Sequence, residues 1–138
     1  MAAGWQLQDL ATSSARQESA ILPIADETDL RSQLERLGQL SPHVVSFRMA
    51  DGEYLQVGIG GPWAFVEHCV DEPWRAEAAV RDPTAFPQPQ PESVWFVCGG
   101  QDSEIPSEYL MPVTEAINLV AAVFRSGRLP ESVQWELQ

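Results

Sequence analysis

Residues 43–60 read HVVSFRMADGEYLQVGIG, and this stretch decides the fold. Apolar and polar residues alternate on both sides of Asp51-Gly52, a pair typical of the tight turn between two antiparallel strands. The alternation predicts one strand over residues 43–49 and a returning strand over residues 54–60. The residues expected to face the core are Val45, Phe47, Met49, Leu55, Val57 and Ile59.

Further strands are predicted downstream of this hairpin. The turn Gly60-Gly61-Pro62 leads into a third strand over residues 63–69, so the first three strands form an antiparallel meander. The nearly continuous apolar run 94–98 predicts a central strand that is buried on both faces. Residues 71–91 contain five prolines, which makes long regular elements improbable there, and only a short helical turn is expected over residues 76–80.

Two amphipathic helices are predicted, each with its own start and stop signals. The first begins at Asp26, with Asp26 or Thr28 as its N-cap residue, and ends at Gly38. The second follows Pro112, which suits the first turn of a helix, and ends at Gly127. Their apolar faces carry Leu30, Leu34 and Leu37 in the first helix, and Val113, Ile117, Val120 and Phe124 in the second. A last alternating strand is expected over residues 133–137.

This order of elements predicts a single α+β domain over residues 26–138. We expect a mainly antiparallel sheet of about five strands with two main helices. Residues 1–25 are rich in Ala, Ser and Gln and are interpreted as a loosely attached N-terminal arm. Trp5, Leu7 and Leu10 are its residues that could dock on the domain. The whole chain has 138 residues, the length of one ordinary domain.

The charge balance limits the partners that this chain can have. Asp and Glu number 20 against 8 basic residues, all of them Arg, which gives a net charge of −12. Such a surface repels bare nucleic acid and anionic membranes. Residues 1–10 lack the pattern of a signal peptide, and no apolar run is long enough to span a bilayer. We therefore expect a cytoplasmic protein that binds neither nucleic acid nor membrane directly.

Few residues have the pattern of a catalytic or metal site. Cys69 and Cys98 form no CxxC motif and are expected to be reduced and buried. His68 and Cys69 are adjacent on a strand, so they point to opposite faces and cannot share a metal. A site made of His68, Asp71 and Glu72 is the alternative, but these residues are more simply polar residues at a strand end. We expect no cofactor, no metal and no catalysis; a small hydrolase that uses Cys98 or an acidic pair is the weaker alternative.

The acidic residues gather in two windows of the sequence. Residues 51–74 contain five acids and no base, and residues 82–124 contain six acids and no base. These windows also contain aromatic residues in predicted loops, a combination that suits a basic protein partner. The residues expected to bind that partner are Glu67, Asp71, Glu72, Trp74, Asp102, Glu104 and Glu108.

An ordered series of short motifs resembles a known family. The motifs are Glu104-Ile105-Pro106, Met111-Pro112, Glu115-Ala116, Phe124-Arg125-Ser126-Gly127-Arg128-Leu129-Pro130 and Val133-Gln134-Trp135-Glu136. Together they resemble the C-terminal half of a bacterial immunity protein family, the one catalogued first among the immunity proteins of polymorphic toxin systems. The strand over residues 55–60, with the glycine turn and the strand that follow it, is also similar to this family. The resemblance covers about residues 47–137.

The resemblance implies a non-enzymatic protein that binds a cognate toxin domain in the producing cell and blocks it. The toxins of this family are often directed at nucleic acids and include deaminases and nucleases. A toxin that grips DNA or RNA has a basic groove, which an acidic protein can occupy. Gly127, Pro130 and Trp135 read as structural positions, and no contact residue carries over. The alternative function is a non-enzymatic adaptor or regulatory module that binds another basic protein.

Overall fold

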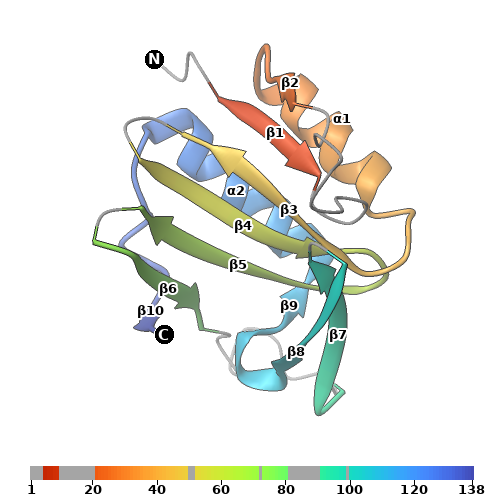
Figure 1. The fold of residues 1–138 in the computed structure, drawn as a ribbon. Helices are drawn as coiled ribbons and strands as arrows, with labels where there is room; N and C mark the ends of the chain where they lie inside the picture. The colour runs from red at the N-terminus through yellow and green to blue at the C-terminus, as the bar shows by residue number, and fades with distance from the viewer. Residues whose placement is uncertain (1–4, 10–20, 50–51, 72, 81–90, 99) are drawn as a thin grey trace.

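The computed structural model describes residues 5–9, 21–49, 52–71, 73–80, 91–98 and 100–138 (Figure 1). Its first half contains β1 (Gln6–Asp9), β2 (Ile21–Pro23), α1 (Glu27–Leu37), β3 (His43–Arg48), β4 (Glu53–Ile59), β5 (Trp63–Val70) and β6 (Arg75–Ala79). Its second half contains β7 (Ser93–Cys98), β8 (Gln101–Pro106), the 3-10 helix η1 (Ser107–Tyr109), β9 (Met111–Pro112), α2 (Val113–Ser126) and β10 (Trp135–Leu137).

The described strands form one curled sheet of ten, and seven of them make its main path in the order β10-β6-β5-β4-β3-β1-β2, with each neighbouring pair antiparallel. The meander predicted over β3, β4 and β5 is confirmed and continues into β6. The β7–β8 hairpin leaves this path and joins β3 through one parallel pair, His43 with Val97. The α+β class is therefore confirmed. The expected count of about five strands was too low, and the sheet is mixed because of the β3–β7 pair.

Both helices cover the same face of the sheet, and α2 lies behind β3, β4 and β5 in Figure 1. The Asp26 carboxylate caps α1 by accepting a hydrogen bond of 2.8 Å from the backbone N–H of Asp29. Gly127 ends α2 with φ of +74°, a left-handed conformation that favours glycine. The predicted core faces of both helices are confirmed by the burial of Leu30, Leu34, Leu37, Ile117, Val120 and Phe124.

The N-terminal segment belongs to this core wherever it is described. Its strand β1 pairs with β2 and with β3, and Leu7 lies opposite Phe47. Trp5 and Leu7 are buried in the main hydrophobic cluster, so the expected docking of these two residues is confirmed. Residues 5–9 are consequently an integrated sheet strand and not a loosely attached arm. Leu10, the third residue expected to dock, lies outside the described residues.

Two sequence-based expectations about local structure were wrong. Residues 76–79 were expected to form part of a helical turn but belong to strand β6, because pairing with β5 and β10 overrides the helical preference of alanine. Residues 94–98 were expected to form a central strand buried on both faces. Instead β7 belongs to the hairpin that branches from the sheet, and the side chain of Trp95 is 56% exposed. An apolar run alone does not distinguish these two positions.

A second, smaller hydrophobic cluster holds the β7–β8 hairpin on the helix-free face of the sheet. Its buried members are Val44, Phe65, Phe96 and Leu110. Phe96 of β7 meets Phe65 of β5 edge to face, with ring centroids 5.0 Å apart. Gly58 makes room for this contact, since a Cβ atom at that position would lie 2.1 Å from the Phe65 ring. Within the described residues, neither helix is long and apolar enough to cross a membrane.

Candidate functional site

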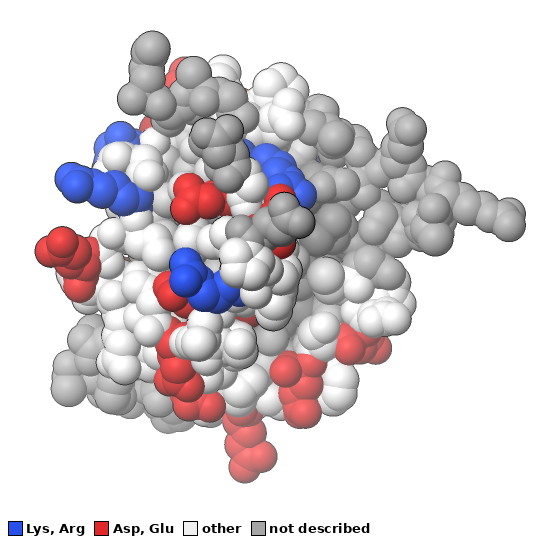
Figure 2. All heavy atoms as spheres, turned by 60° about the vertical axis from the view of Figure 1, so that its left-hand side comes forward, with Lys and Arg blue, Asp and Glu red and all other residues white. Residues whose placement is uncertain are grey.

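Basic side chains are distributed unevenly over the surface. Figure 2 shows Arg and acidic side chains together in the upper and middle parts of the molecule, whereas the lower part of this face carries acidic side chains alone among the described residues. Figures 1 and 2 are related by a turn about the vertical axis, so the lower part corresponds to the region of β10, η1 and the ends of β7 and β8. From Pro91 to Leu110 the sequence contains four acids and no base. This part of the surface is therefore the strongest candidate for contact with a basic partner.

The β7–β8 hairpin has one buried face and one outer face. Phe96 of β7 points into the second cluster, with Val94 and Cys98 of the same strand and Ile105 of β8 packed against it. Alternation along the two strands therefore turns the other residues outward. We call this set the hairpin face: Ser93, Trp95, Val97, Asp102, Glu104 and Pro106. Trp95 lies directly opposite Glu104 in the pairing of the two strands.

Glu104 is held in place beside the exposed indole of Trp95. The Ser93 hydroxyl donates a hydrogen bond of 2.7 Å to the Glu104 carboxylate. Asp102 lies two residues before Glu104 on β8, and its side chain is on the same side of the strand. A carboxylate fixed next to an exposed aromatic ring can bind a cationic side chain through both an ion pair and a cation–π contact. Tryptophan is also among the residues that contribute most to binding at protein interfaces.

Glu108 lies in η1, immediately after β8, and is exposed. The next residue, Tyr109, donates a hydrogen bond of 2.8 Å from its hydroxyl to the Glu136 carboxylate on β10. This bond links η1 to the edge of the main sheet. The structure thus places Asp102, Glu104 and Glu108, three of the predicted partner-binding residues, on one continuous segment of chain.

Asp71 and Trp74 form a separate group at the β5–β6 turn, on the other side of the view in Figure 1. The Asp71 carboxylate already has a cationic partner, because Arg48 approaches it to 2.7 Å. Arg48 also lies over the ring of Tyr54, 4.8 Å from its centroid. Trp74 follows Asp71 in the same turn, and its side chain is 63% exposed. We call Arg48, Tyr54, Asp71 and Trp74 the turn cluster. Glu72 lies outside the described residues.

Glu67 differs from the other predicted contact residues because it is partly buried. It lies on β5, on the helix-free face, and accepts a weak hydrogen bond from the Cys69 thiol with an S–O distance of 3.4 Å. Burial raises the pKa of the Glu67 carboxyl above its usual value. The pKa of the Cys69 thiol rises to about 12 through burial and the nearby Glu67 carboxylate. Glu67 therefore belongs to the packed sheet and not to the outer acidic surface.

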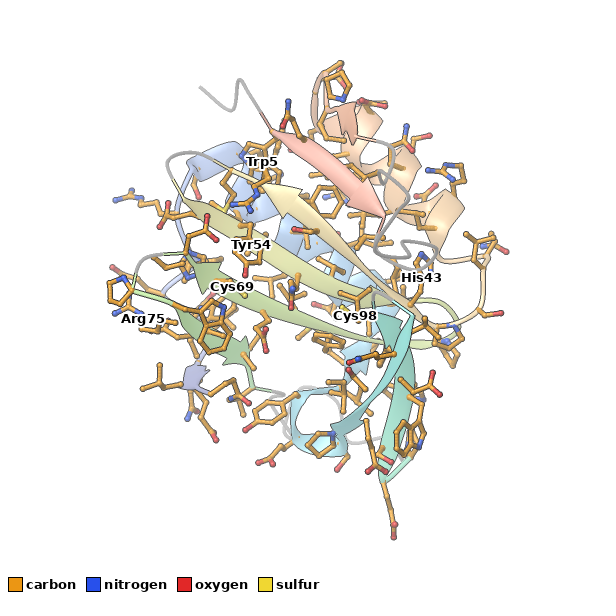
Figure 3. All side chains as sticks on the ribbon, viewed as in Figure 1. Trp5, His43, Tyr54, Cys69, Arg75 and Cys98 are labelled. Atoms are coloured by element: carbon orange, nitrogen blue, oxygen red, sulfur yellow. The ribbon has the colours of Figure 1, made fainter. Side chains whose placement is uncertain are left out.

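The two cysteines lie on the same side of the sheet, and both are free thiols. Figure 3 shows Cys69 beside Tyr54, on neighbouring strands, and Cys98 farther along toward the hairpin. Burial, followed by the charge of Glu67, raises the pKa of the Cys98 thiol as well. A cysteine nucleophile needs a lowered pKa, so neither thiol has the environment that nucleophilic catalysis requires.

The histidines are engaged in structural contacts. His68 Nε2 lies 3.4 Å from a Glu53 carboxylate oxygen, and the His43 Nδ1 atom lies 2.7 Å from the carbonyl oxygen of Ser41. Over the residues that the structure describes, no three His, Cys, Asp or Glu side chains come together as metal ligands. The alternative metal site of His68, Asp71 and Glu72 stays a hypothesis, because Glu72 lies outside the described residues.

Sequence reasoning missed Trp95, the most exposed aromatic residue of the hairpin. The sequence did contain a signal for its exposure. The strand that follows Gly99-Gly100 carries Asp102 and Glu104, and a central strand buried on both faces would not pair with so acidic a strand. An acidic partner strand indicates that β7 has one exposed face.

Comparison with known proteins gives one match along nearly the whole chain. The family model described as Immunity protein Imm1 matches residues 7–137. The search of curated proteins returned no significant match.

Proposed function

The chain belongs to the Imm1 family of immunity proteins, and from this premise we propose that it neutralises one cognate toxin by covering the toxin's active site. Family membership implies an immunity protein that acts on a toxin. The covering of the active site is our own inference. It requires a surface that binds tightly and a toxin groove that accepts it, and the chain offers a surface of this kind on the hairpin.

The observation that supports this mechanism is the hairpin face. It combines an exposed tryptophan, a carboxylate oriented by Ser93 and a second acid two residues away. Because Glu104 is already oriented, less side-chain entropy is lost on binding than with a free glutamate. We assign the main contact to Trp95, Asp102, Glu104 and Glu108, and a second contact to Asp71 and Trp74 of the turn cluster. Glu67 stays a weaker candidate because it is partly buried.

The proposed toxin is directed at nucleic acid, as a deaminase or a nuclease would be. Such an enzyme binds phosphates with a basic groove, and a net charge of −12 is complementary to that groove. The chain would act without catalysis or cofactor, and the encounter would take place in the cytoplasm of the producing cell. The immunity protein would then occupy the position of the substrate backbone.

The test pairs the purified chain with the toxin domain encoded beside its gene. We expect the two proteins to co-purify, and we expect toxin activity to fall to zero at one equivalent of the chain. Cells that express the toxin should survive when the wild-type chain is co-expressed. A chain that neither binds nor inhibits this toxin would contradict the proposal.

Two matched variants locate the contact surface. Trp95→Ala and Trp74→Ala each remove an exposed indole, one from the hairpin face and one from the turn cluster. We expect Trp95→Ala to weaken binding by about 2 kcal/mol or more, as loss of an interface tryptophan usually does. Trp74→Ala should have the smaller effect. If Trp74→Ala alone weakens binding, the main contact lies on the turn cluster and not on the hairpin.

A further inference from the structure

Strand β8 lies at the edge of the sheet, and its outer side pairs with no other described strand. It contains six residues and pairs with β7, its sole partner among the described strands. Among the other described edge strands, β2 and β10 have three residues each and β9 has two. Natural sheets protect their edges by keeping them short, because a long edge is a template for pairing with another chain. By this criterion β8 is the edge that can accept a further strand.

The register of the hairpin shows which backbone groups of β8 point outward. Antiparallel strands alternate between hydrogen-bonded and non-hydrogen-bonded pairs. Val97 donates its N–H to Pro42 O, away from β8, so Val97 and its opposite residue Asp102 form a non-hydrogen-bonded pair. At the other end of the hairpin, the Ser107 N–H donates to Glu92 O, so these two residues form a hydrogen-bonded pair, as the same alternation requires.

It follows that the N–H and C=O groups of Asp102 and Glu104 point away from β7. Neither N–H donates to another described residue. Pro106 is the next residue of β8 whose backbone points away from β7. It has no N–H, so the row of outward donors ends there, at the C-terminal end of β8. The strand therefore presents a short docking edge, two outward N–H groups long, which ends at a proline.

We propose that an extended segment of the cognate toxin adds to β8 as the next strand of the sheet. The inference rests on the proposed function, because the partner is the toxin that the chain neutralises. The backbone of Asp102 and Glu104 would hydrogen-bond to the incoming strand, and their side chains would lie beside its alternate residues. The segment that fits carries Lys or Arg at positions i and i+2, facing these two carboxylates.

The same two acids argue against a second copy of the chain as the occupant. If two β8 strands paired with each other, Asp102 and Glu104 of one copy would lie beside the same acids of the other. Like charges on directly opposite residues destabilise a strand pair. The carboxylates therefore prevent self-association through this edge and leave it available to a basic strand.

The decisive experiment compares Glu104→Pro with Glu104→Ala. Both variants remove the carboxylate, but the proline also removes the outward N–H. That N–H is not used in the β7–β8 ladder, so the hairpin itself keeps its hydrogen bonds. We expect Glu104→Pro to bind the toxin at least about tenfold more weakly than Glu104→Ala, because an acceptor on the toxin strand loses its donor. Equal affinities of the two variants would overturn the strand addition.

A second measurement does not depend on a mutation. Amide hydrogen exchange of the wild-type chain should show fast exchange at Asp102 and Glu104 in the free protein and slow exchange in the toxin complex. Ser103 and Ile105, whose N–H groups face β7, should be protected in both states. Unchanged fast exchange at Asp102 and Glu104 in a complex that forms would refute the strand addition and leave the immunity function standing. A wild-type chain that does not bind the toxin would refute both.

Discussion

The indole of Trp5 meets the ring of Phe124 edge to face, with ring centroids 4.9 Å apart and planes at 85°. The contact joins the N-terminal segment to the last turns of α2. Trp5 also lies 6.1 Å from the ring of Phe47 on β3, so it bridges helix and sheet. Both Trp5 and Phe124 are buried in the main cluster. A residue near the start of the chain therefore completes the packing of its C-terminal helix.

The first prediction concerns this aromatic pair. Phe124→Ala and Trp5→Ala should each lower the free energy of unfolding by about 3–5 kcal/mol, because each empties a buried aromatic site. The double variant should show a coupling of about 0.5–1.5 kcal/mol, as edge-to-face pairs do. Chemical denaturation measures all three values. Trp95→Ala, an equal change at an exposed site, is the control and should cost less than about 0.5 kcal/mol. A loss below about 1 kcal/mol for Phe124→Ala would mean that this face of α2 is not packed.

The second prediction tests the proposal that the acidic hairpin attracts a basic toxin. Replacing Asp102 and Glu104 together by Asn and Gln should slow association by about threefold to tenfold at low salt. It should also flatten the salt dependence of association, since steering is screened beyond about 8–10 Å at physiological ionic strength. Stopped-flow kinetics at several salt concentrations gives both quantities.

Asp71→Asn is the control for this experiment. Asp71 is paired with Arg48 at 2.7 Å, so the field of its charge is partly cancelled at a distance. Its replacement should change association less than replacement of either hairpin acid. If the double hairpin variant associates as fast as the wild-type chain at every salt concentration, the acids do not steer the toxin.

The third prediction concerns Gly58 and the attachment of the hairpin. Gly58→Ala should cost about 1–3 kcal/mol of stability, because the new methyl group must displace Phe65 from its contact with Phe96. The loss should be accompanied by faster amide exchange in β7 and β8. Gly61→Ala is the comparison, since nothing lies within 4 Å of a Cβ atom there and only the strain of its positive φ is added. Normal exchange in the hairpin of Gly58→Ala would show that Phe65 does not anchor it.

The fourth prediction concerns the pH dependence of stability. Burial raises the pKa of Glu67 in the folded chain, so the charged form is less favourable there than in the unfolded chain. Stability linked to Glu67 is therefore complete below the usual pKa of 4.5 and is lost as the pH rises through the folded value. Glu67→Gln should consequently raise the Tm relative to the wild-type chain at pH 7.5. The difference should shrink as the pH falls toward 4. A Tm difference that is the same at both pH values would contradict the raised pKa.

Local signals in the sequence were sufficient for the helices and the meander. Asp26 and Gly127 mark helix ends through their own backbone chemistry, and the alternation from His43 to Gly60 fixes the register through the turn between the strands. The elements that were predicted wrongly depend on pairing with strands that are distant in the sequence. Strand β6 exists because β5 and β10 pair with it, and no residue of 76–79 carries that information.

The candidate site was predictable in its chemistry but not in its location. Composition indicated an acidic surface, and Asp102, Glu104 and Glu108 do lie on one exposed segment. Sequence distance could not show that Asp71 is neutralised by Arg48, 23 residues away, or that Glu67 is partly buried. Trp95 was missed because its apolar neighbours resemble those of a core strand. Its exposure depends on the hairpin branching away from β3.

The separation of the two hydrophobic clusters has a consequence for how such a protein diversifies. Phe96 and Leu110 fasten the β7–β8 hairpin through the small cluster, while the helices stabilise the rest of the sheet through the large one. Residues on the hairpin face contribute to neither cluster, so they can be exchanged through mutation without loss of the fold. Under the proposed function, a toxin that changes its groove can therefore be followed by an immunity protein that changes a few side chains on one hairpin. Coevolution of the two partners would then leave a record of rapid substitution at the outward positions of β7 and β8, beside inward positions that stay apolar.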